Sequence, residues 1–109
     1  MLLSTDVWVG ALIRRAELEG ANAVVVKKGD ARAGAVIVKA YDTATRSARL
    51  WTEATGQDGE PLWIQPVASE FESELDAYLD RQRRYDPDLW IIEIEDRQGR
   101  NFLTEKTQG

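Results

Sequence analysis

The chain has 109 residues, of which 43% are hydrophobic and 30% charged, and its formal net charge is −5. This composition is typical of one globular domain, and the longest apolar runs are far shorter than the roughly 18 residues that a membrane span requires. The sequence contains no cysteine and no histidine. Disulfides, the usual zinc sites and Ser–His–Asp catalysis are therefore excluded.

Charge is distributed unevenly along the chain. Residues 1–50 carry eight basic and five acidic side chains, whereas residues 51–109 carry six basic and fourteen acidic ones. The acidic balance argues against generic duplex-DNA binding, because affinity for phosphates comes from clustered Lys and Arg. The N-terminal stretch lacks the basic region and the cleavage site of a secretory signal, and we expect a cytoplasmic protein without a membrane partner.

The first predicted element is a helix over residues 6–19. Ser4 or Thr5 can cap its start, and Gly20 can end it. Its apolar face is formed by residues at helical spacing, namely Trp8, Leu12, Ile13 and Ala16.

Four short strands are predicted after this helix. They are rich in β-branched and aromatic residues and are separated by turns that contain Gly, Asp, Thr and Ser. Pro61 and Pro66 confine the fourth strand to a sheet edge, or are themselves confined to the ends of that strand. The four segments, predicted to form an antiparallel meander, are residues 21–28, 35–41, 48–54 and 61–67.

A second helix is predicted from a capping box formed by Ser69 and Glu72. Asp86–Pro87 ends this helix, because the residue before a proline disfavours the α conformation. The apolar stripe comprises Phe71, Leu75, Tyr78 and Leu79.

The stretch from Trp90 onward alternates as a strand with one buried face. Gly99 suits the left-handed position of a hairpin loop, after which residues 101–103 can return as a partner strand. Glu93 and Glu95 share a face and could bind a divalent cation or act as an acid–base pair. Without a histidine or a third clustered ligand, an ordinary exposed strand face is the favoured interpretation.

These elements predict a single α+β domain over residues 1–109, with residues 1–4 and 105–109 frayed. Its two helices are expected to pack on a mainly antiparallel sheet in the order helix, four-strand meander, helix, hairpin.

Three segments in this order, "VWVGALIRR", "VVKKGDARAGAVIVK" and "RYDPDLWIIEIEDRQGRNFL", resemble the motifs of a family of small bacterial proteins known only as a domain of unknown function. The family motifs are "W-V-x-A-L-x-R-R", "R/K-G-D-x-x-A-G-A" and "D-P-D-L-W-x-x-E-I-E-D". The resemblance extends from about residue 4 to 104. It implies one compact α+β domain of bacterial cytoplasmic origin, and it implies no activity and no functional residues.

The loop "KKGDARAG" at residues 27–34 is a candidate anion site. Its glycine-flanked backbone, with Lys28 and Arg32 nearby, could cradle a phosphate. It lacks the spacing of a P-loop, and a hairpin loop that needs positive φ explains its glycines equally well.

One face of the predicted meander mixes aromatic rings with cations. If Val24, Val26, Val36, Val38, Leu50, Leu62 and Ile64 face the core, strand alternation sends another set to the opposite side. That set is Lys27, Lys39, Tyr41, Arg49, Trp51, Trp63 and Gln65. Three interpretations remain open, namely a protein interface, internal packing under a helix, and stacking on single-stranded nucleic acid.

The favoured function is a non-enzymatic interaction module that binds a protein partner, or a second copy of itself, through the Trp51 and Trp63 face. The alternative is single-stranded nucleic-acid binding by the same face. We predict no catalytic residue, no metal ligand and no cofactor. A third hypothesis is a carboxylate enzyme or metal site near the end of the chain, formed by Asp86, Asp88, Glu93, Glu95 and Asp96.

Overall fold

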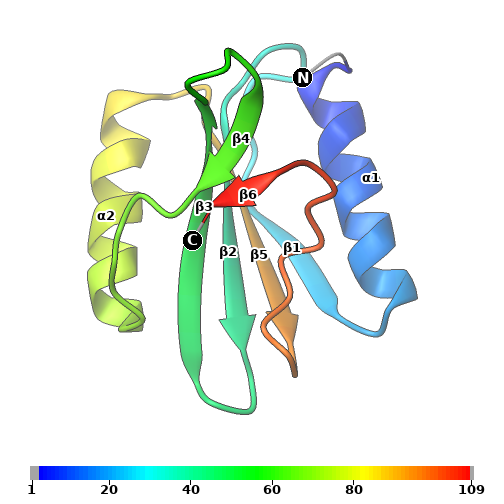
Figure 1. Ribbon diagram of the computed structural model, residues 1–109, viewed down its shortest axis with the longest axis vertical. Helices are drawn as coiled ribbons and strands as arrows, with labels where there is room; N and C mark the ends of the chain where they lie inside the picture. The colour runs from blue at the N-terminus through cyan, green and yellow to red at the C-terminus, as the bar shows by residue number, and fades with distance from the viewer. Residues whose placement is uncertain (1–2, 109) are drawn as a thin grey trace.

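The computed structural model describes residues 3–108, which form two helices and six strands (Figure 1). No helix within this range is both long and apolar enough to cross a bilayer. In chain order the elements are α1 (Thr5–Leu18), β1 (Asn22–Lys27), β2 (Val36–Asp42), β3 (Ser47–Thr55), β4 (Pro61–Ile64), α2 (Glu72–Tyr85), β5 (Trp90–Asp96) and β6 (Thr107–Gln108).

The six strands form one mixed sheet in the order β1-β5-β2-β3-β4-β6. Strand β5 lies between β1 and β2, antiparallel to the first and parallel to the second. Strand β6 is parallel to β4. The predicted antiparallel meander is therefore wrong, although the α+β class and the two helices are present. The meander failed because a strand near the end of the chain inserts between two strands that are consecutive in sequence.

The composition of β5 explains its central place. Leu89, Trp90, Ile91 and Ile92 are all buried, so this segment is covered on both of its faces. Such a continuous apolar run is typical of a strand inside a sheet, whereas a half-exposed hairpin strand alternates. The parallel pairing with β2 also requires a long crossover connection, which includes α2.

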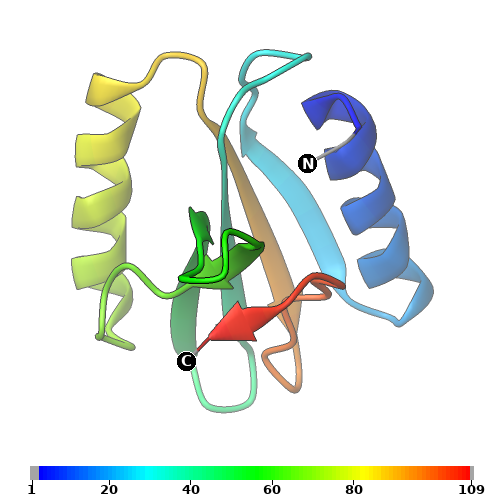
Figure 2. The same ribbon diagram turned by 45° about the horizontal axis from the view of Figure 1, so that its top comes forward.

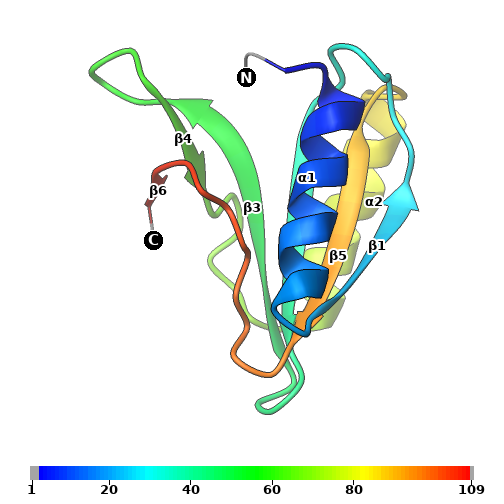
Figure 3. The same ribbon diagram turned by 90° about the vertical axis from the view of Figure 1, so that its right-hand side faces the viewer.

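The helices cover opposite faces of the sheet, which lies between them in Figure 2. One apolar cluster joins α1 to alternate residues of the central strands, including Val38, Trp51 and Ile92. The other joins α2 to the intervening residues, including Leu50 and Ile91. Figure 3 shows β3 and β4 curving away from the helices, with β6 beside β4.

The helix ends differ in detail from the prediction. Gly20 follows α1 with φ of +85°, as expected for a helix terminus. The predicted capping box of α2 is wrong, because the helix begins at Glu72 and its N-cap is Phe71. Ser69 instead accepts the backbone N–H of Phe71 through Oγ at 3.1 Å, which orders the loop before the helix.

The glycines of the loop between β1 and β2 permit a close backbone approach. A Cβ at Gly29 or Gly34 would collide with the carbonyl oxygen of Asp88 and the ring of Trp90. The carbonyl of Asp30 accepts the Trp90 indole N–H at 2.7 Å, which holds the two segments together. Neither glycine has positive φ, so the explanation that we expected from the sequence is wrong for both.

The segment after β5 does not return as a hairpin strand. Gly99 has the expected left-handed conformation, with φ of +67°, but residues 101–103 are irregular and Phe102 has φ of +59°. The Arg15 guanidinium donates two hydrogen bonds to the Phe102 carbonyl, at 3.0 and 3.2 Å. The chain then crosses to β4, where Thr107–Gln108 add β6. Residues 1, 2 and 109, part of the ends predicted to be frayed, lie outside the described residues.

Candidate functional site

The residues predicted to form a partner-binding face lie on different faces of the sheet. Across β2 and β3, Val38 is opposite Trp51 and Lys39 is opposite Leu50. Directly opposite residues share a face, whereas the prediction had grouped Val38 with Leu50. The predicted assignment of β3 side chains to the two faces is thus wrong by one residue relative to β2. A shift of one residue moves every side chain of the strand to the opposite face. Trp51 and Trp63 are consequently buried in the core beneath α1.

The other residues of the predicted face are scattered. Lys39 is buried under α2, and Tyr41 packs against the core on that side. Arg49 is exposed and pairs with Glu70 at 3.0 Å. Lys27 donates from Nζ to the carbonyl oxygen of Leu89 at 2.8 Å. The residues of the predicted face therefore do not combine into an exposed face that carries both rings and cations.

The buried tryptophans join distant segments. The rings of Trp8 and Trp63 stack with centroids 5.2 Å apart and an interplanar angle of 11°. Trp8 donates from Nε1 to Glu105 at 2.7 Å, whereas Nε1 of Trp63 has no hydrogen-bond partner among residues 3–108. The Trp63 side chain therefore contributes to stability through packing alone, whereas the sequence analysis predicted that it binds a partner.

A charged cluster lies beneath α2. The Nζ atom of Lys39 lies 2.7 Å from Glu72, 3.1 Å from Asp76 and 3.2 Å from Glu93. Burial alone would lower the pKa of Lys39, but hydrogen bonds to Glu72 and Asp76 and the charge of Glu93 outweigh it, and the pKa is raised. Lys39 is thus a permanent cation that joins α2 to the sheet.

The polar groups of the predicted anion loop form hydrogen bonds within the loop and to α1. The Asp30 carboxylate accepts the backbone N–H groups of Arg32 and Ala33, at 3.1 and 2.9 Å. The carbonyl oxygens of Ala31 and Arg32 accept the first N–H groups of α1. Lys28 and Arg32 are exposed and form none of the ion pairs found in residues 3–108. The loop geometry is accounted for by its contacts to α1 and to Trp90.

The carboxylates near the end of β5 serve structural contacts. Glu93 faces Lys39, and Asp96 accepts two hydrogen bonds from the Arg100 guanidinium at 2.9 Å. Within residues 3–108, no group of three or more Asp or Glu side chains is arranged to hold a metal ion. The hypothesis of a metal site at Asp86, Asp88, Glu93, Glu95 and Asp96 finds no support in this geometry.

The Asp96–Arg100 contact predicts a specific loss of stability in acid. The Arg100 hydrogen bond outweighs the effect of burial, and backbone N–H groups of Arg100 and Gln98 add to it, so the pKa of Asp96 is lowered to about 2. Because the folded pKa lies below the unfolded value, the contact stabilises the protein by about 2 kcal/mol above pH 4 and loses this effect as the pH falls toward 2.

Urea unfolding of Asp96→Asn between pH 2 and 7 measures this effect. We expect the wild-type advantage to shrink as the pH falls from 4 to 2, because the protonated aspartic acid no longer carries the charge that Arg100 binds. Asp58→Asn is the control, since Asp58 is exposed and, among residues 3–108, accepts a hydrogen bond only from the backbone N–H of Glu60. An advantage independent of pH would contradict the role assigned to the Asp96 charge.

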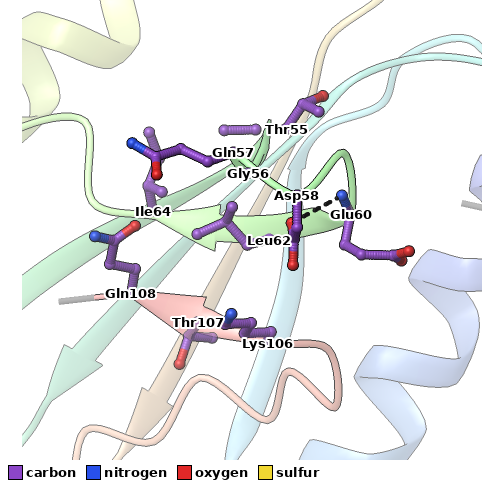
Figure 4. A pocket seen from close by; sticks show the side chains of 11 residues that line it. Thr55, Gly56, Gln57, Asp58, Glu60, Leu62, Ile64, Lys106, Thr107 and Gln108 are labelled. Atoms are coloured by element: carbon purple, nitrogen blue, oxygen red, sulfur yellow. Dashed lines mark hydrogen bonds between the residues drawn. The ribbon is translucent and has the colours of Figure 1, made fainter.

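A groove of about 780 Å³ lies beside the β3–β4 hairpin and β6 (Figure 4). Leu62 and Ile64 contribute apolar surface, with Gln57, Lys106 and Gln108 among the polar residues around them. These three polar side chains are exposed, and none is held in place by a side-chain hydrogen bond within residues 3–108. Of the lining carboxylates, Asp58 is held by the backbone N–H of Glu60 at 3.0 Å, but the three side chains without such a bond leave the groove without a fixed polar set.

The edge strand β1 exposes an apolar surface. Val24, Val25 and Val26 are 44%, 42% and 47% exposed, although they are consecutive residues of a strand. Strand β1 ends the sheet, so its outer backbone groups have no partner strand within residues 3–108. A cavity of about 320 Å³ separates this edge from α2, and we call it the β1–α2 groove. It is lined by Val26, Lys39, Asp76, Leu79, Asp80, Arg83, Ile91 and Glu93.

Sequence reasoning missed this edge because it assigned Val24 and Val26 to the core. An apolar run of β-branched residues normally indicates a buried strand. The signal that could have corrected the assignment is the basic pair Lys27 and Lys28 at its end. Lysines of this kind are typical of sheet edges.

Comparison with known protein families identifies the relatives of this chain. Residues 3–104 match the family described as "Protein of unknown function (DUF1491)". The chain belongs to the DUF1491 family. This relationship confirms the resemblance seen in the sequence and covers the α+β domain from the start of α1 to the segment before β6. The comparison with curated proteins gave no match.

Solved structures of similar proteins share this fold. The crystal structure of a DUF1491 family protein from Caulobacter crescentus has 64% identity and a TM-score of 0.95, over 98% of this chain and 100% of that one. An NMR structure of a DUF1491 protein from the same organism also has 64% identity, with a TM-score of 0.92, over 100% and 99%. Protein Atu0922 from A. tumefaciens has 32% identity and a TM-score of 0.81, over 100% and 98%.

Proposed function

We propose that this DUF1491 protein is a non-enzymatic interaction module that binds a protein partner by adding a strand of that partner to the free edge of β1. The observation that carries the proposal is the exposure of three consecutive valines on an edge strand. Unpaired backbone groups at a sheet edge supply hydrogen bonds to an added strand, and the exposed side chains supply apolar contact.

The proposal moves the interaction surface from the Trp51 and Trp63 face to β1. Both tryptophans are buried, so contact with a partner through them would require the core to open. Stacking of single-stranded nucleic acid on the same rings meets the same obstacle. No observation favours the nucleic-acid alternative, whereas β1 offers apolar surface without any rearrangement.

Affinity capture from native cell lysate with the wild type and Val24→Lys tests this proposal. Lysine on an exposed edge position opposes strand addition but leaves the fold intact, since Val24 is 44% exposed. We expect a protein partner to be captured by the wild type and lost with Val24→Lys, and nuclease treatment of the lysate to leave its recovery unchanged.

The matched control is Leu18→Lys, which introduces the same residue at another exposed apolar position, on α1. This variant should recover the partner like the wild type. Slower hydrogen exchange of the β1 amides in the isolated complex would locate the contact. Equal recovery by the Val24→Lys variant would rule out the edge as the binding surface.

A further inference from the structure

The β1–α2 groove adjoins the free edge of β1 on the side of the sheet that α2 covers. Val26 belongs to both, since it is exposed on the edge strand and lines the groove. Leu79 of α2 and Ile91 of β5 add apolar surface beneath it. A strand added to β1 would therefore place alternate side chains on the side of the sheet where this groove lies.

The groove carries excess negative charge. Four carboxylates, those of Glu72, Asp76, Asp80 and Glu93, lie in it or around Lys39, against the two cations Lys39 and Arg83. Lys39 is 4% exposed and its ammonium is surrounded by three carboxylates, so it offers nothing to a partner. Asp80 takes part in none of the ion pairs of residues 3–108.

The distances match the reach of a long cationic side chain. Val24 of β1 is opposite Glu93 of β5, and neighbouring strands are about 5 Å apart. A residue added opposite Val24 would thus start about 10 Å from the β5 backbone. Lys and Arg can cover part of this gap by laying their methylene groups over the exposed valines, with the charge directed toward the groove. The acidic side chains that line the groove reach the rest of the way.

We infer that the partner strand recognised by β1 is basic on its α2-facing side, with Lys or Arg alternating with apolar residues. This inference rests on the proposed function and specifies the chemistry of its partner. The apolar edge provides the binding surface, and the charge of the groove selects among strands that could pair with it.

A second copy of the chain matches this chemistry poorly. The exposed part of its own β1, Val24 to Val26, has no basic residue. The ammonium of Lys27 already donates to the carbonyl oxygens of Pro87 and Leu89, at 2.7 and 2.8 Å. A self-associated edge would leave the acidic groove without an added cation.

Selection of a phage-displayed library of random peptides on the full chain tests the inference. We expect selected peptides to alternate β-branched residues with Lys or Arg. The affinity of a selected peptide should fall about tenfold with Asp80→Lys, a ratio equivalent to about 1.4 kcal/mol. Glu74→Lys is the matched control, because it makes the same charge change on α2 but outside the groove, and it should leave the affinity unchanged.

The remaining outcomes separate this inference from the proposed function. Selected peptides without a basic preference, or an affinity insensitive to Asp80→Lys, would overturn the inference while binding at β1 stands. Equal selection on the Val24→Lys variant would overturn both. Sedimentation that reveals a dimer, dissociated by Val24→Lys, would assign the edge to a second copy and also overturn the basic partner.

Discussion

Replacing Trp63 by alanine is expected to destabilise the protein by about 3–5 kcal/mol, the cost of deleting a fully buried aromatic side chain. Trp63 is 0% exposed. Its ring stacks on Trp8 and belongs to the core beneath α1. Deleting it leaves a cavity where α1 and β4 meet, and the rigid sheet cannot fully close this cavity. Urea unfolding followed by far-UV circular dichroism measures the loss.

Two further variants separate packing from hydrogen bonding. Trp63→Phe should cost less than Trp63→Ala, because phenylalanine keeps an aromatic ring that leaves a smaller cavity. The indole N–H, which both variants remove, has no hydrogen-bond partner within residues 3–108. Phe71→Ala removes a ring that is 72% exposed and should change the stability by less than about 0.5 kcal/mol. A loss below about 1 kcal/mol for Trp63→Ala would indicate that this ring is accessible in solution, as the sequence had suggested.

Replacing Lys39 by methionine is expected to destabilise the protein by about 3 kcal/mol, at the lower end of the range for removing one partner of a buried ion pair. The variant leaves Glu72, Asp76 and Glu93 close together without their shared cation. Their mutual repulsion then opposes the docking of α2 on the sheet. The cost is moderated because the three carboxylates are partly exposed and can be hydrated.

Arg49→Met is the matched control for Lys39→Met. It breaks the pair with Glu70, whose two side chains are 51% and 58% exposed, and should cost less than about 1 kcal/mol. Because the folded pKa of Lys39 is raised, its contribution should be complete below the unfolded pKa of about 10.4 and be lost only at higher pH. Equal costs for the two variants in urea unfolding would contradict a special role for the buried cation.

The packing of Trp63 and the ion pairs of Lys39 explain why the interaction surface does not lie on the face predicted from the sequence. The residues with the strongest chemical signal in the sequence, the tryptophans and Lys39, are used to attach the two helices to the sheet. The residues with the weakest signal, the three valines of β1, remain exposed. Composition alone identifies which side chains can bind strongly, but not whether the fold has already used them.

Local patterns in the sequence determined both helices, the positions of the strands β1 to β5, and the left-handed glycines at residues 20 and 99. These features depend on neighbours within a few residues, through helical spacing, β-branched runs and turn chemistry. The missing histidine and cysteine likewise bounded the chemistry without any structure.

Only the tertiary structure decided the strand order, the register and therefore the faces. The insertion of β5 between β1 and β2 depends on contacts between residues far apart in the chain, and local propensity carries no information about them. A shift of one residue in the β2–β3 pairing exchanges the two faces of a strand. That shift places Trp51 on the face beneath α1, and its burial follows because α1 covers that face.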